Sequence, residues 1–508
     1  MTEHAEVDIT DSSKPEDPVG PEYAEIAAFF DEFAATEPRW RQRNRTYYDL
    51  IRRIHRFQIP PNMRVLEIGC GSGDLLAALE PSVGVGLDIS ARMVELARDR
   101  HPNLRFEREA GEHVDLGETF DYVVCSDLVP FVHDLTALLD RIAAHCHPET
   151  RIVIHSYSRL WRPAIRMAER LRLKPRKPIR NWVSPEDVTN LLELSDLEVV
   201  TLTRRLLMPK RIPFIDVVLN GVLASLWPFN HLCLSYWIVA RPRPRGRDEL
   251  TVSVVCPCRN EKGNVAEVVR RLPALGAATE LVFVEGGSTD GTAEEIERQI
   301  ALHPDRDISF VPQTGKGKGD AVRCGFRAAK HELMMILDGD LSVQPEDLPK
   351  FYRACAEGRG ELVNGSRLVY NVEPGAMRFA NFVGNRIFSW LFGGITGQGV
   401  KDTLCGTKVL RRSAYEQIAA GRAFFGEFDP FGDFDLLLGA ARLNLKIVDL
   451  PVRYQPRVYG TTNISRWRHG LLLLRMIGFA FWKFRVAPVR GLRRRTDSLE
   501  HDEAAKRE

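Results

Sequence analysis

The sequence lacks several features that would assign it to a specialised class of protein. Its 508 residues have a formal net charge of only +2, so charge alone indicates no nucleic-acid partner. The nine cysteines are scattered, and the closest pair, Cys256-Pro-Cys258, has neither zinc-knuckle nor redox spacing. We therefore expect buried, reduced thiols in a cytoplasmic enzyme.

The sequence also lacks a signal peptide and an uninterrupted apolar run long enough to span a bilayer. Residues 1–24 are acidic and polar at their start, and we predict that they form a disordered tail. Residues 212–240 are apolar but interrupted by polar residues and a proline. We interpret them as two buried segments around a loop, with membrane contact as the alternative.

The bulk composition is that of a soluble globular protein, with 44% hydrophobic and 27% charged residues. A chain of this length needs more than one core. The stretch at residues 241–249 is rich in proline, glycine and arginine, and we interpret it as a linker. It separates a predicted domain at 25–240 from another at 250–470, and residues 471–508 follow as an amphipathic helix and basic tail.

Short apolar strands alternate with amphipathic helices in both halves, which is typical of doubly wound α/β domains. In the first half, strands are predicted at residues 65–68, 83–87, 122–126 and 152–155, and helices at 75–79, 91–99 and 135–144. In the second half, strands are predicted at residues 252–256, 281–284, 308–311 and 334–337, and helices at 265–272, 293–301 and 320–330. No long repeat relates the halves, so we expect two unrelated domains.

A glycine-rich turn follows the first predicted strand, in Val-Leu-Glu-Ile-Gly-Cys-Gly-Ser-Gly at residues 65–73. Glycines between a strand and a helix allow a ligand to approach the backbone N–H groups at the helix start. The spacing of Gly69, Gly71 and Gly73 differs from that of dinucleotide-binding enzymes. Asp88 ends the next strand, where a carboxylate can accept both hydroxyls of a ribose.

These residues resemble the first motif of class I S-adenosylmethionine-dependent methyltransferases, which have a Rossmann-like fold. The resemblance implies that Glu67, Gly69, Gly71 and Gly73 line the cofactor and that Asp88 holds its ribose. It places Ala110-Gly-Glu112 at the adenine, and Ser126 and Asp127 at the strand end that faces the methyl acceptor. His133, His155, Tyr157 and Trp161 are further candidates near the acceptor, although packing is the simpler explanation for each. The acceptor itself is not readable from the sequence.

Two carboxylates in the second half follow a buried strand, in Leu333-Met-Met-Ile-Leu-Asp-Gly-Asp at residues 333–340. Of three Asp-x-Asp pairs in the chain, only Asp338 and Asp340 directly follow an apolar strand. Carboxylates at the ligand edge of a parallel sheet can bind Mg²⁺ or Mn²⁺, which would neutralise a leaving diphosphate.

Polar segments follow three of the predicted strands, and the third of these segments is a basic loop. They are Pro257-Cys-Arg-Asn-Glu261, Glu285-Gly-Gly-Ser-Thr-Asp290 and the loop Thr314-Gly-Lys-Gly-Lys-Gly-Asp320. A flexible basic loop before a helix suits phosphate contacts. The strand ends therefore present polar groups along one edge.

This ordered set resembles the family 2 inverting glycosyltransferases of GT-A fold. The resemblance implies nucleotide or diphosphate contacts from Pro257, Arg259, Asn260, Glu261, Glu285, Lys316, Lys318 and Arg457. Glu285-Gly286 departs from the Asp-Asp pair usual in the family, which makes the base contact uncertain. Asp338 and Asp340 are expected at the ribose and metal, with Asp340 the better metal ligand.

Later segments resemble the polyprenyl-phosphate glycosyltransferase branch, namely Gly365-Ser-Arg367, Asp402-Thr-Leu-Cys-Gly-Thr-Lys408 and Arg457-Val-Tyr-Gly-Thr-Thr-Asn463. Asp433 and Asp435 open a predicted helix at residues 436–443, and either is a candidate base for an acceptor hydroxyl. A phosphate acceptor would need no base. The alternative is that both acids only stabilise the helix dipole.

The C-terminal stretch 469–486 is apolar, with Arg475, Lys483 and Arg485 interspersed and more arginines after it. It predicts either a helix on an anionic membrane surface or one packed on the catalytic domain. The first alternative would place the protein peripherally on the inner face of the cytoplasmic membrane.

Together these features predict a bifunctional enzyme of glycan or cell-envelope biosynthesis. The second half would transfer a sugar from a nucleotide-sugar to a polyprenyl phosphate or glycan, using Mg²⁺ or Mn²⁺. The first half would use S-adenosylmethionine to methylate a related acceptor. The alternatives are a regulatory cofactor-binding module in the first half, or a nucleotidyltransferase, although the first loop lacks that class's glycines.

Overall fold

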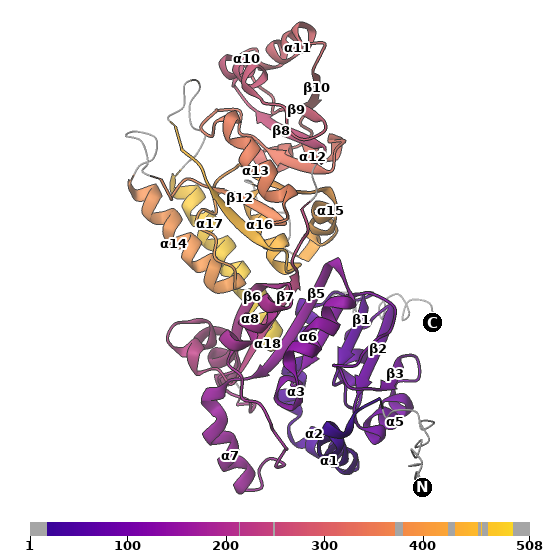
Figure 1. Ribbon diagram of the computed structural model, residues 1–508. Helices are drawn as coiled ribbons and strands as arrows, with labels where there is room; N and C mark the ends of the chain where they lie inside the picture. Colours follow the sequence, from indigo (N-terminus) through magenta and orange to yellow (C-terminus); the bar gives the residue numbers. More distant parts are fainter. Residues whose placement is uncertain are drawn as a thin grey trace, which may run out of the picture. The chain divides into compact units, whose positions relative to one another are not determined.

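The computed structural model describes residues 18–212, 214–246, 249–370, 379–424, 432–455, 459 and 466–490. The chain forms two compact units (Figure 1). Unit 1 comprises Met1–Tyr48 and Pro60–Leu197, and unit 2 comprises Asp49–Ile59 and Glu198–Glu508. Two seven-stranded sheets with flanking helices make this an α/β protein, as the sequence predicts.

The first sheet has the strand order β3-β2-β1-β4-β5-β7-β6. Its strands are β1 (Arg64–Ile68), β2 (Val83–Asp88), β3 (Arg105–Arg108), β4 (Phe120–Ser126), β5 (Cys146–Tyr157), β6 (Leu197–Arg205) and β7 (Ser235–Pro242). β1 pairs in parallel with β2 and β4, so these three strands end at one edge. That edge receives the glycine turn and Asp88.

Helices and short helical turns flank this sheet. They are η1 (Pro21–Tyr23), α1 (Ala24–Ala34), α2 (Glu37–Arg43), α3 (Arg45–Gln58), α4 (Asp74–Ala78), α5 (Ala91–Arg100), η2 (Val129–Phe131), α6 (Leu135–Ala144), η3 (Arg159–Trp161), α7 (Arg162–Arg170) and α8 (Pro185–Leu194). Side-chain caps fix two of the helix starts. Ser90 accepts the N–H of Met93 before α5, and Asp134 accepts those of Thr136 and Ala137 before α6.

The second sheet has the order β10-β9-β8-β11-β13-β12-β14. Its strands are β8 (Val252–Cys258), β9 (Thr279–Glu285), β10 (Asp307–Pro312), β11 (Leu333–Ile336), β12 (Leu362–Ser366), β13 (Lys408–Arg411) and β14 (Ile447–Pro451). β8 pairs in parallel with β9 and β11, and β9 with β10. Their carboxyl ends therefore meet at one edge, whereas β13 runs antiparallel to β11 and β12.

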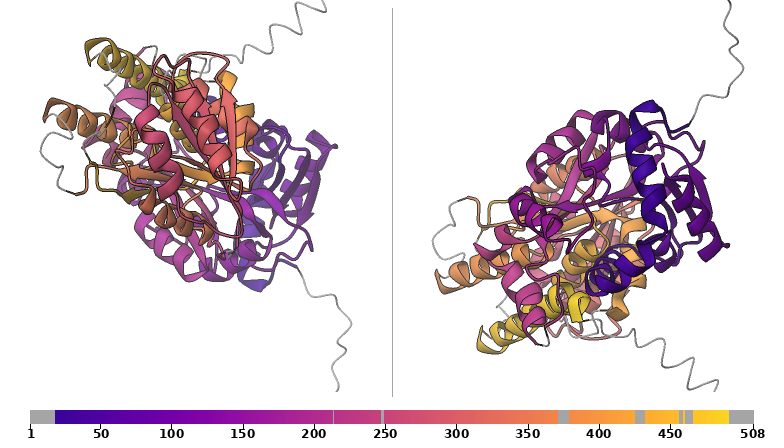
Figure 2. Two further views of the ribbon diagram at one scale, coloured as in Figure 1. Left: turned by 90° about the horizontal axis from the view of Figure 1, so that it is seen from above. Right: turned by 90° about the horizontal axis from the view of Figure 1, so that it is seen from below.

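The helices of the second half are α9 (Ile215–Val217), η4 (Val218–Val222), η5 (Leu223–Ser225), η6 (Phe229–Leu232), α10 (Lys262–Arg271), α11 (Thr292–Leu302), α12 (Lys318–Ala328), η7 (Pro345–Asp347), α13 (Leu348–Ala356), α14 (Phe379–Thr396), α15 (Arg412–Ala420), η8 (Arg422–Phe424), α16 (Asp433–Arg442), α17 (Arg466–Phe481), η9 (Trp482–Val486) and α18 (Ala487–Arg490). α14 and α17 lie side by side as two long helices (Figures 1 and 2). Among the described residues, no helix has both the length and the apolar character needed to cross a membrane.

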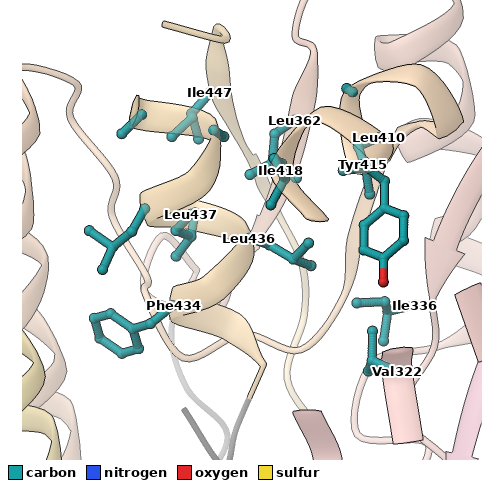
Figure 3. Packing of buried hydrophobic residues seen from close by; sticks show 14 of the residues in the cluster. Val322, Ile336, Leu362, Leu410, Tyr415, Ile418, Phe434, Leu436, Leu437 and Ile447 are labelled. Carbon is teal, nitrogen blue, oxygen red and sulfur yellow. The ribbon is translucent and has the colours of Figure 1, made fainter. Parts of the chain in front are cut away.

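A hydrophobic core under the second sheet supports the start of α16. Phe434, Leu436 and Leu437 of that helix are buried in one cluster with strand residues Ile336 and Leu362 (Figure 3). Burying a side chain of this size contributes about 1.5–3 kcal/mol. The core therefore holds α16 at a defined distance from the β11 strand end.

Three features differ from the sequence-based expectations. Val19 and Tyr23, expected in a disordered tail, are buried. Arg241, expected in an exposed linker, lies in β7 and is buried between Glu198 and Glu361, at 3.0 Å from Glu361. The segment after β6 exposes many apolar side chains, although we expected two buried segments around a loop. The sequence around Arg241 cannot indicate its partner Glu361, which lies more than 100 residues away along the chain.

Candidate active sites

The glycine turn after β1 has the backbone that its sequence predicts. Gly69, Gly71 and Gly73 have φ values of 74°, 52° and 74°, which side chains other than glycine rarely adopt. A Cβ at Gly69 would lie 2.8 Å from Leu128, and one at Gly73 would lie 2.6 Å from Phe106. A Cβ at Gly71 would meet nothing within 4 Å, so this glycine faces open space where a ligand can approach.

Asp88 at the end of β2 accepts two backbone hydrogen bonds. Gly71 N–H donates to Oδ2 at 2.8 Å, and Ser90 N–H donates to Oδ1 at 2.9 Å. Each carboxylate oxygen can accept a second bond, so both remain able to accept ribose hydroxyls. Burial raises the pKa of Asp88 above its usual value, against the effect of these two N–H groups. The carboxylate thus ties the glycine turn to β2.

Glu67 at the end of β1 is buried with one oxygen unsatisfied. Its Oε2 has no hydrogen-bond partner among the described residues. Burial raises the pKa of Glu67 to about 8, although a backbone N–H at Leu76 and the charge of Arg41 act in the opposite sense. A buried acceptor with no donor is costly, and a cationic ligand group would satisfy it.

Glu112 and Ser126, both predicted to bind the cofactor, form hydrogen bonds with other residues of the protein. The Glu112 carboxylate accepts the hydroxyl of Tyr23 and, through Oε1, the backbone N–H groups of His133 (3.1 Å) and Asp134 (3.2 Å). Ser126 Oγ lies 3.1 Å from Nδ1 of the buried His155. Glu112 thus ties the segment after β3 to Tyr23 and to the residues before α6, and Ser126 ties β4 to β5; their cofactor contacts stay predictions.

A polar cluster surrounds Asp127, which directly follows β4. Tyr47 OH donates to Asp127 Oδ2 at 3.0 Å, and the ring of Tyr157 stacks on that of Tyr47 at 6.1 Å. The Lys174 ammonium lies 4.5 Å from the Tyr157 ring centre. Burial lowers the pKa of Lys174 to about 8 and that of His155 below its usual value. Tyr47 and Lys174 lie outside every motif in the sequence, so no local signal indicated them.

The second site centres on Asp338, two residues beyond β11. Lys318 Nζ at the start of α12 lies 2.6 Å from Asp338 Oδ1. Burial alone would raise the pKa of Asp338, but Lys318, with help from Lys408 and Arg367, lowers it below its usual value. A Cβ at Gly406 would lie 2.2 Å from Asp338 Oδ2, so the loop before β13 closes directly over this pair.

Asp340 lies beside Asp338 in the same turn and is buried. Its Oδ1 accepts the backbone N–H of Ser342 at 3.0 Å. Within the described ranges, no group of three or more His, Cys, Asp or Glu side chains could hold a metal ion. Mg²⁺ is commonly bound by one or two carboxylates plus substrate phosphates, so Asp338 and Asp340 fit an ion completed by a diphosphate.

The ends of β8 and β9 are joined by reciprocal hydrogen bonds between two polar turns. Asn260 N–H donates to Ser288 Oγ at 2.9 Å, and Asn260 Oδ1 accepts Thr289 N–H at 2.9 Å. Glu261 N–H donates to Thr292 Oγ1 at 3.0 Å. Asn260 has a φ of 57°, a left-handed conformation that asparagine tolerates. The predicted nucleotide-binding residues Pro257, Arg259, Asn260, Glu261 and Glu285 therefore lie on adjacent strand ends.

The basic loop between β10 and α12 is closed by an acid. Asp320 Oδ2 accepts the backbone N–H of Gly315 at 2.7 Å and the side-chain N–H of Gln313 at 3.1 Å. Of the two predicted phosphate-binding lysines, Lys318 contacts Asp338, whereas Lys316 is exposed in the preceding loop.

A buried ion pair between Arg367 and Asp402 lies near Asp338, since the charge of Arg367 acts on the Asp338 carboxylate. Arg367 donates to Asp402 through Nε at 2.7 Å and Nη2 at 2.9 Å, and Asn385 also donates to Asp402 at 2.6 Å. Burial would raise the pKa of Asp402, but Arg367 lowers it to about 2. Lys408, the first residue of β13, is also buried, and its ammonium donates to the carbonyl of Cys405.

The candidate bases at α16 are only partly described. A Cβ at Gly432, before α16, would lie 2.7 Å from Gly319, so the helix starts beside the basic loop. Asp435 pairs with Arg422 Nε at 2.8 Å, which the helix-dipole alternative also allows. The backbone of Asp433 begins α16, but its side chain lies outside the described part of the chain, as does Arg457. Their proposed roles stay predictions.

Two family models match the sequence. Residues 253–419 match the model "Glycosyl transferase family 2", and residues 39–202 match a model described as "Methyltransferase domain". The first match contains the whole Asp338 site, and the second contains the glycine turn and the Asp127 cluster.

Curated relatives match the second half. Glycosyltransferase AglJ of Haloferax volcanii is 32% identical over 43% of this chain and 68% of the relative. The low-salt glycan biosynthesis hexosyltransferase Agl6 of the same organism is 29% identical over 46% of this chain and 55% of its own length. The undecaprenyl-phosphate 4-deoxy-4-formamido-L-arabinose transferase of Pseudomonas aeruginosa is 29% identical over 34% of this chain and half of the relative.

Solved structures resemble each half at low sequence identity. A methyltransferase of Thermotoga maritima, described as a possible histamine N-methyltransferase, is 18% identical over 43% of this chain and 100% of its own, with a TM-score of 0.34. Glucosyl-3-phosphoglycerate synthase of Mycobacterium tuberculosis is 20% identical over 46% and 80% of the two chains, with a TM-score of 0.34. Neither value bears on substrate or mechanism.

Proposed function

Since the chain belongs to glycosyl transferase family 2 and also has a methyltransferase domain, we propose that it is a bifunctional enzyme of glycan assembly. In this proposal, the Asp338 site transfers a sugar from a nucleotide-sugar to a polyprenyl phosphate, with inversion. The Asp88 site binds S-adenosylmethionine for methylation of a related acceptor. The observation that most supports the transferase assignment is the Lys318–Asp338 pair beneath the Gly406 loop.

The charges around Asp338 suit a leaving diphosphate. An acceptor oxygen forms a bond to the anomeric carbon while the bond from that carbon to the nucleoside diphosphate breaks. The diphosphate leaves with the bonding electrons, so negative charge grows beside Lys318. A preorganised cation in this position stabilises that charge. Asp338 and Asp340 would hold the divalent ion, which when bound supplies further positive charge to the diphosphate.

The same groups favour one of the two predicted acceptor classes. A phosphate oxygen is already ionised at neutral pH and needs no general base. Asp435, the described acid of α16, is engaged by Arg422 at 2.8 Å. Of the two acceptors predicted from the sequence, a polyprenyl phosphate therefore fits this site better, because it does not require a general base. The name of the Pseudomonas relative, an undecaprenyl-phosphate sugar transferase, supports the same choice.

The residues of the first site fit an adenosyl cofactor. Gly71 leaves room at the backbone, Asp88 can accept ribose hydroxyls, and the unsatisfied Glu67 oxygen can accept from a ligand ammonium group. S-adenosylmethionine, when bound, supplies a methyl group on a cationic sulfur. In the Asp127 cluster, neutral His155 and the carboxylate of Asp127 are the groups that can take a proton from an acceptor hydroxyl.

We also propose that the enzyme works at the inner face of the cytoplasmic membrane. Trp390 of α14 and Leu471 of α17 are 69% and 71% exposed, and these two helices lie side by side (Figure 1). Exposed large apolar side chains on adjacent helices favour contact with lipid, where a polyprenyl acceptor resides.

The proposal is tested with the full-length protein, undecaprenyl phosphate and a panel of labelled nucleotide-sugars with Mn²⁺. We expect label to move into the organic phase with one donor, and Asp340→Asn to abolish that transfer. A second assay follows labelled methyl from S-adenosylmethionine into the lipid-linked product. Cofactor binding without methyl transfer to the lipid-linked sugar or any glycan acceptor would favour a regulatory module instead.

A further inference from the structure

Two arginines are buried beside each other in unit 2, and no acidic side chain among the described residues pairs with either. Arg205 ends β6 and Arg485 lies in η9, and they are 7% and 6% exposed. Arg205 Nη1 donates to the carbonyl of Phe484 at 3.3 Å, and Arg485 Nη2 donates to that of Gly394 at 2.5 Å. The Nε–H groups of both have no acceptor in the described part of the chain.

Within the described part of the chain, the pair is a double positive charge with no carboxylate beside it. Burial, together with the adjacent charge of Arg485, lowers the pKa of Arg205 to about 9. Burial lowers the pKa of Arg485 to about 10, so both guanidinium groups are charged at neutral pH. Buried charges in proteins are normally paired, because an unpaired one is costly to desolvate. A bound anion would provide that partner.

The thiol of Cys233 does not provide it. Cys233 lies close enough to interact with both arginines, but burial raises its pKa to about 12 despite them. It is therefore a neutral thiol at physiological pH. Two guanidinium forks with unused donors match the oxygens of a phosphate group better than any other common anion except sulfate.

The surroundings indicate where such a phosphate comes from. Residues 214–232 pack beside the pair, since a Cβ at Gly221 would lie 3.4 Å from Val486. The same segment exposes large apolar side chains, with Phe214 at 87% and Trp227 at 77% exposure. The others are Ile215, Val218, Leu226, Phe229 and Leu232. Aromatic side chains beside basic ones are typical of the interface between lipid tails and headgroups.

We propose that Arg205 and Arg485 bind the phosphate of an anionic phospholipid, while residues 214–232 insert into the headgroup region around it. Neither family model covers these residues, since one match ends at 202 and the other spans 253–419. The site is thus a property of this chain beyond its two predicted reactions, and it requires neither donor sugar nor polyprenyl acceptor.

The test measures binding of the full-length protein to vesicles that contain no polyprenyl phosphate. Neutral phosphatidylcholine vesicles are compared with vesicles that contain about 30% phosphatidylglycerol. The anionic lipid gives the second set a negative surface potential. We expect binding to the anionic vesicles, weakened about fivefold by each of Arg205→Gln and Arg485→Gln. Arg298→Gln is the matched control, because it removes an exposed charge on α11.

Exposed positions keep the test decisive if the arginine variants fold poorly. Trp227→Ser should weaken binding to anionic vesicles, whereas Leu302→Ser, on α11 and 57% exposed, should not. Equal binding to neutral and anionic vesicles, or arginine variants that bind like Arg298→Gln, would overturn the proposal. Inorganic phosphate is tested separately by thermal shift. If it stabilises the wild type but not Arg205→Gln, and vesicles do not bind, the site takes free phosphate and the lipid assignment is wrong.

Discussion

The carboxylates at the two strand edges have opposite electrostatic surroundings. Asp88 and Glu67 in the first sheet accept backbone N–H groups, and burial raises their pKa values. Asp338 and Asp402 in the second sheet lie against Lys318 and Arg367, which lower their pKa values. The first edge suits a ligand that brings its own positive charge and hydroxyl donors. The second already contains the cations that a diphosphate needs.

The largest expected effect comes from removing a cation at the second edge. Arg367→Met would leave Asp402 buried and unpaired, which costs about 3–5 kcal/mol. We expect hydrogen exchange at β12 to accelerate accordingly, while exchange at β2 in the first sheet stays unchanged. Arg298→Met is the control, since an exposed pair contributes less than about 1 kcal/mol.

Adding Asp402→Asn to Arg367→Met sharpens this test. The double variant has no buried charge at the pair and should recover part of the lost protection. If both variants exchange like the wild type, the ion pair does not stabilise the second sheet, and the contrast between the two edges loses its structural basis.

The next effect, of about 4 kcal/mol between pH 5 and 9, concerns Glu67 at the first edge. Unfolded Glu67 ionises near pH 4.5, but folded Glu67 ionises near pH 8. Its contribution to stability is therefore full below pH 4.5 and is lost as pH rises through 8. Chemical denaturation from pH 5 to 9 should show that Glu67→Gln gains stability relative to the wild type as pH rises. A constant difference would mean that folded Glu67 has an ordinary pKa.

A smaller effect is expected from Lys318→Met. Losing one charged hydrogen bond to the diphosphate costs about 1.5–3 kcal/mol. Titration calorimetry with the nucleoside diphosphate of the identified donor should show weaker binding by about one to two orders of magnitude. S-adenosylmethionine affinity should not change. Lys350→Met, which removes an exposed lysine on α13, is the matched control, and equal losses in both variants would contradict a local role.

The strand ends could be predicted from sequence because apolar runs followed by glycine or acid are local patterns. The predicted strand at 65–68 and helix at 135–144 agree with β1 and α6 to within a residue. Side-chain partners were not predictable in this way. Arg205 and Arg485 are 280 positions apart, and nothing near either residue indicates the other.

The partners of Arg241 were also not predictable from the sequence around it. Its local sequence, with alternating proline and arginine, is typical of an exposed linker. In the structure it pairs with Glu361, a residue that only the folded chain brings near. Local composition predicted the irregular, largely exposed backbone of residues 243–246 but not the burial of Arg241.

The central claim is that one chain holds two chemically distinct sites, one for an adenosyl cofactor and one for a nucleotide-sugar. Titration calorimetry of both ligands on Asp88→Asn and Asp340→Asn, in the presence of Mn²⁺, tests it most directly. We predict that Asp88→Asn weakens S-adenosylmethionine alone and that Asp340→Asn weakens the nucleotide-sugar alone. If either substitution weakens both ligands in a folded protein, or neither, the assignment of two separate sites is wrong.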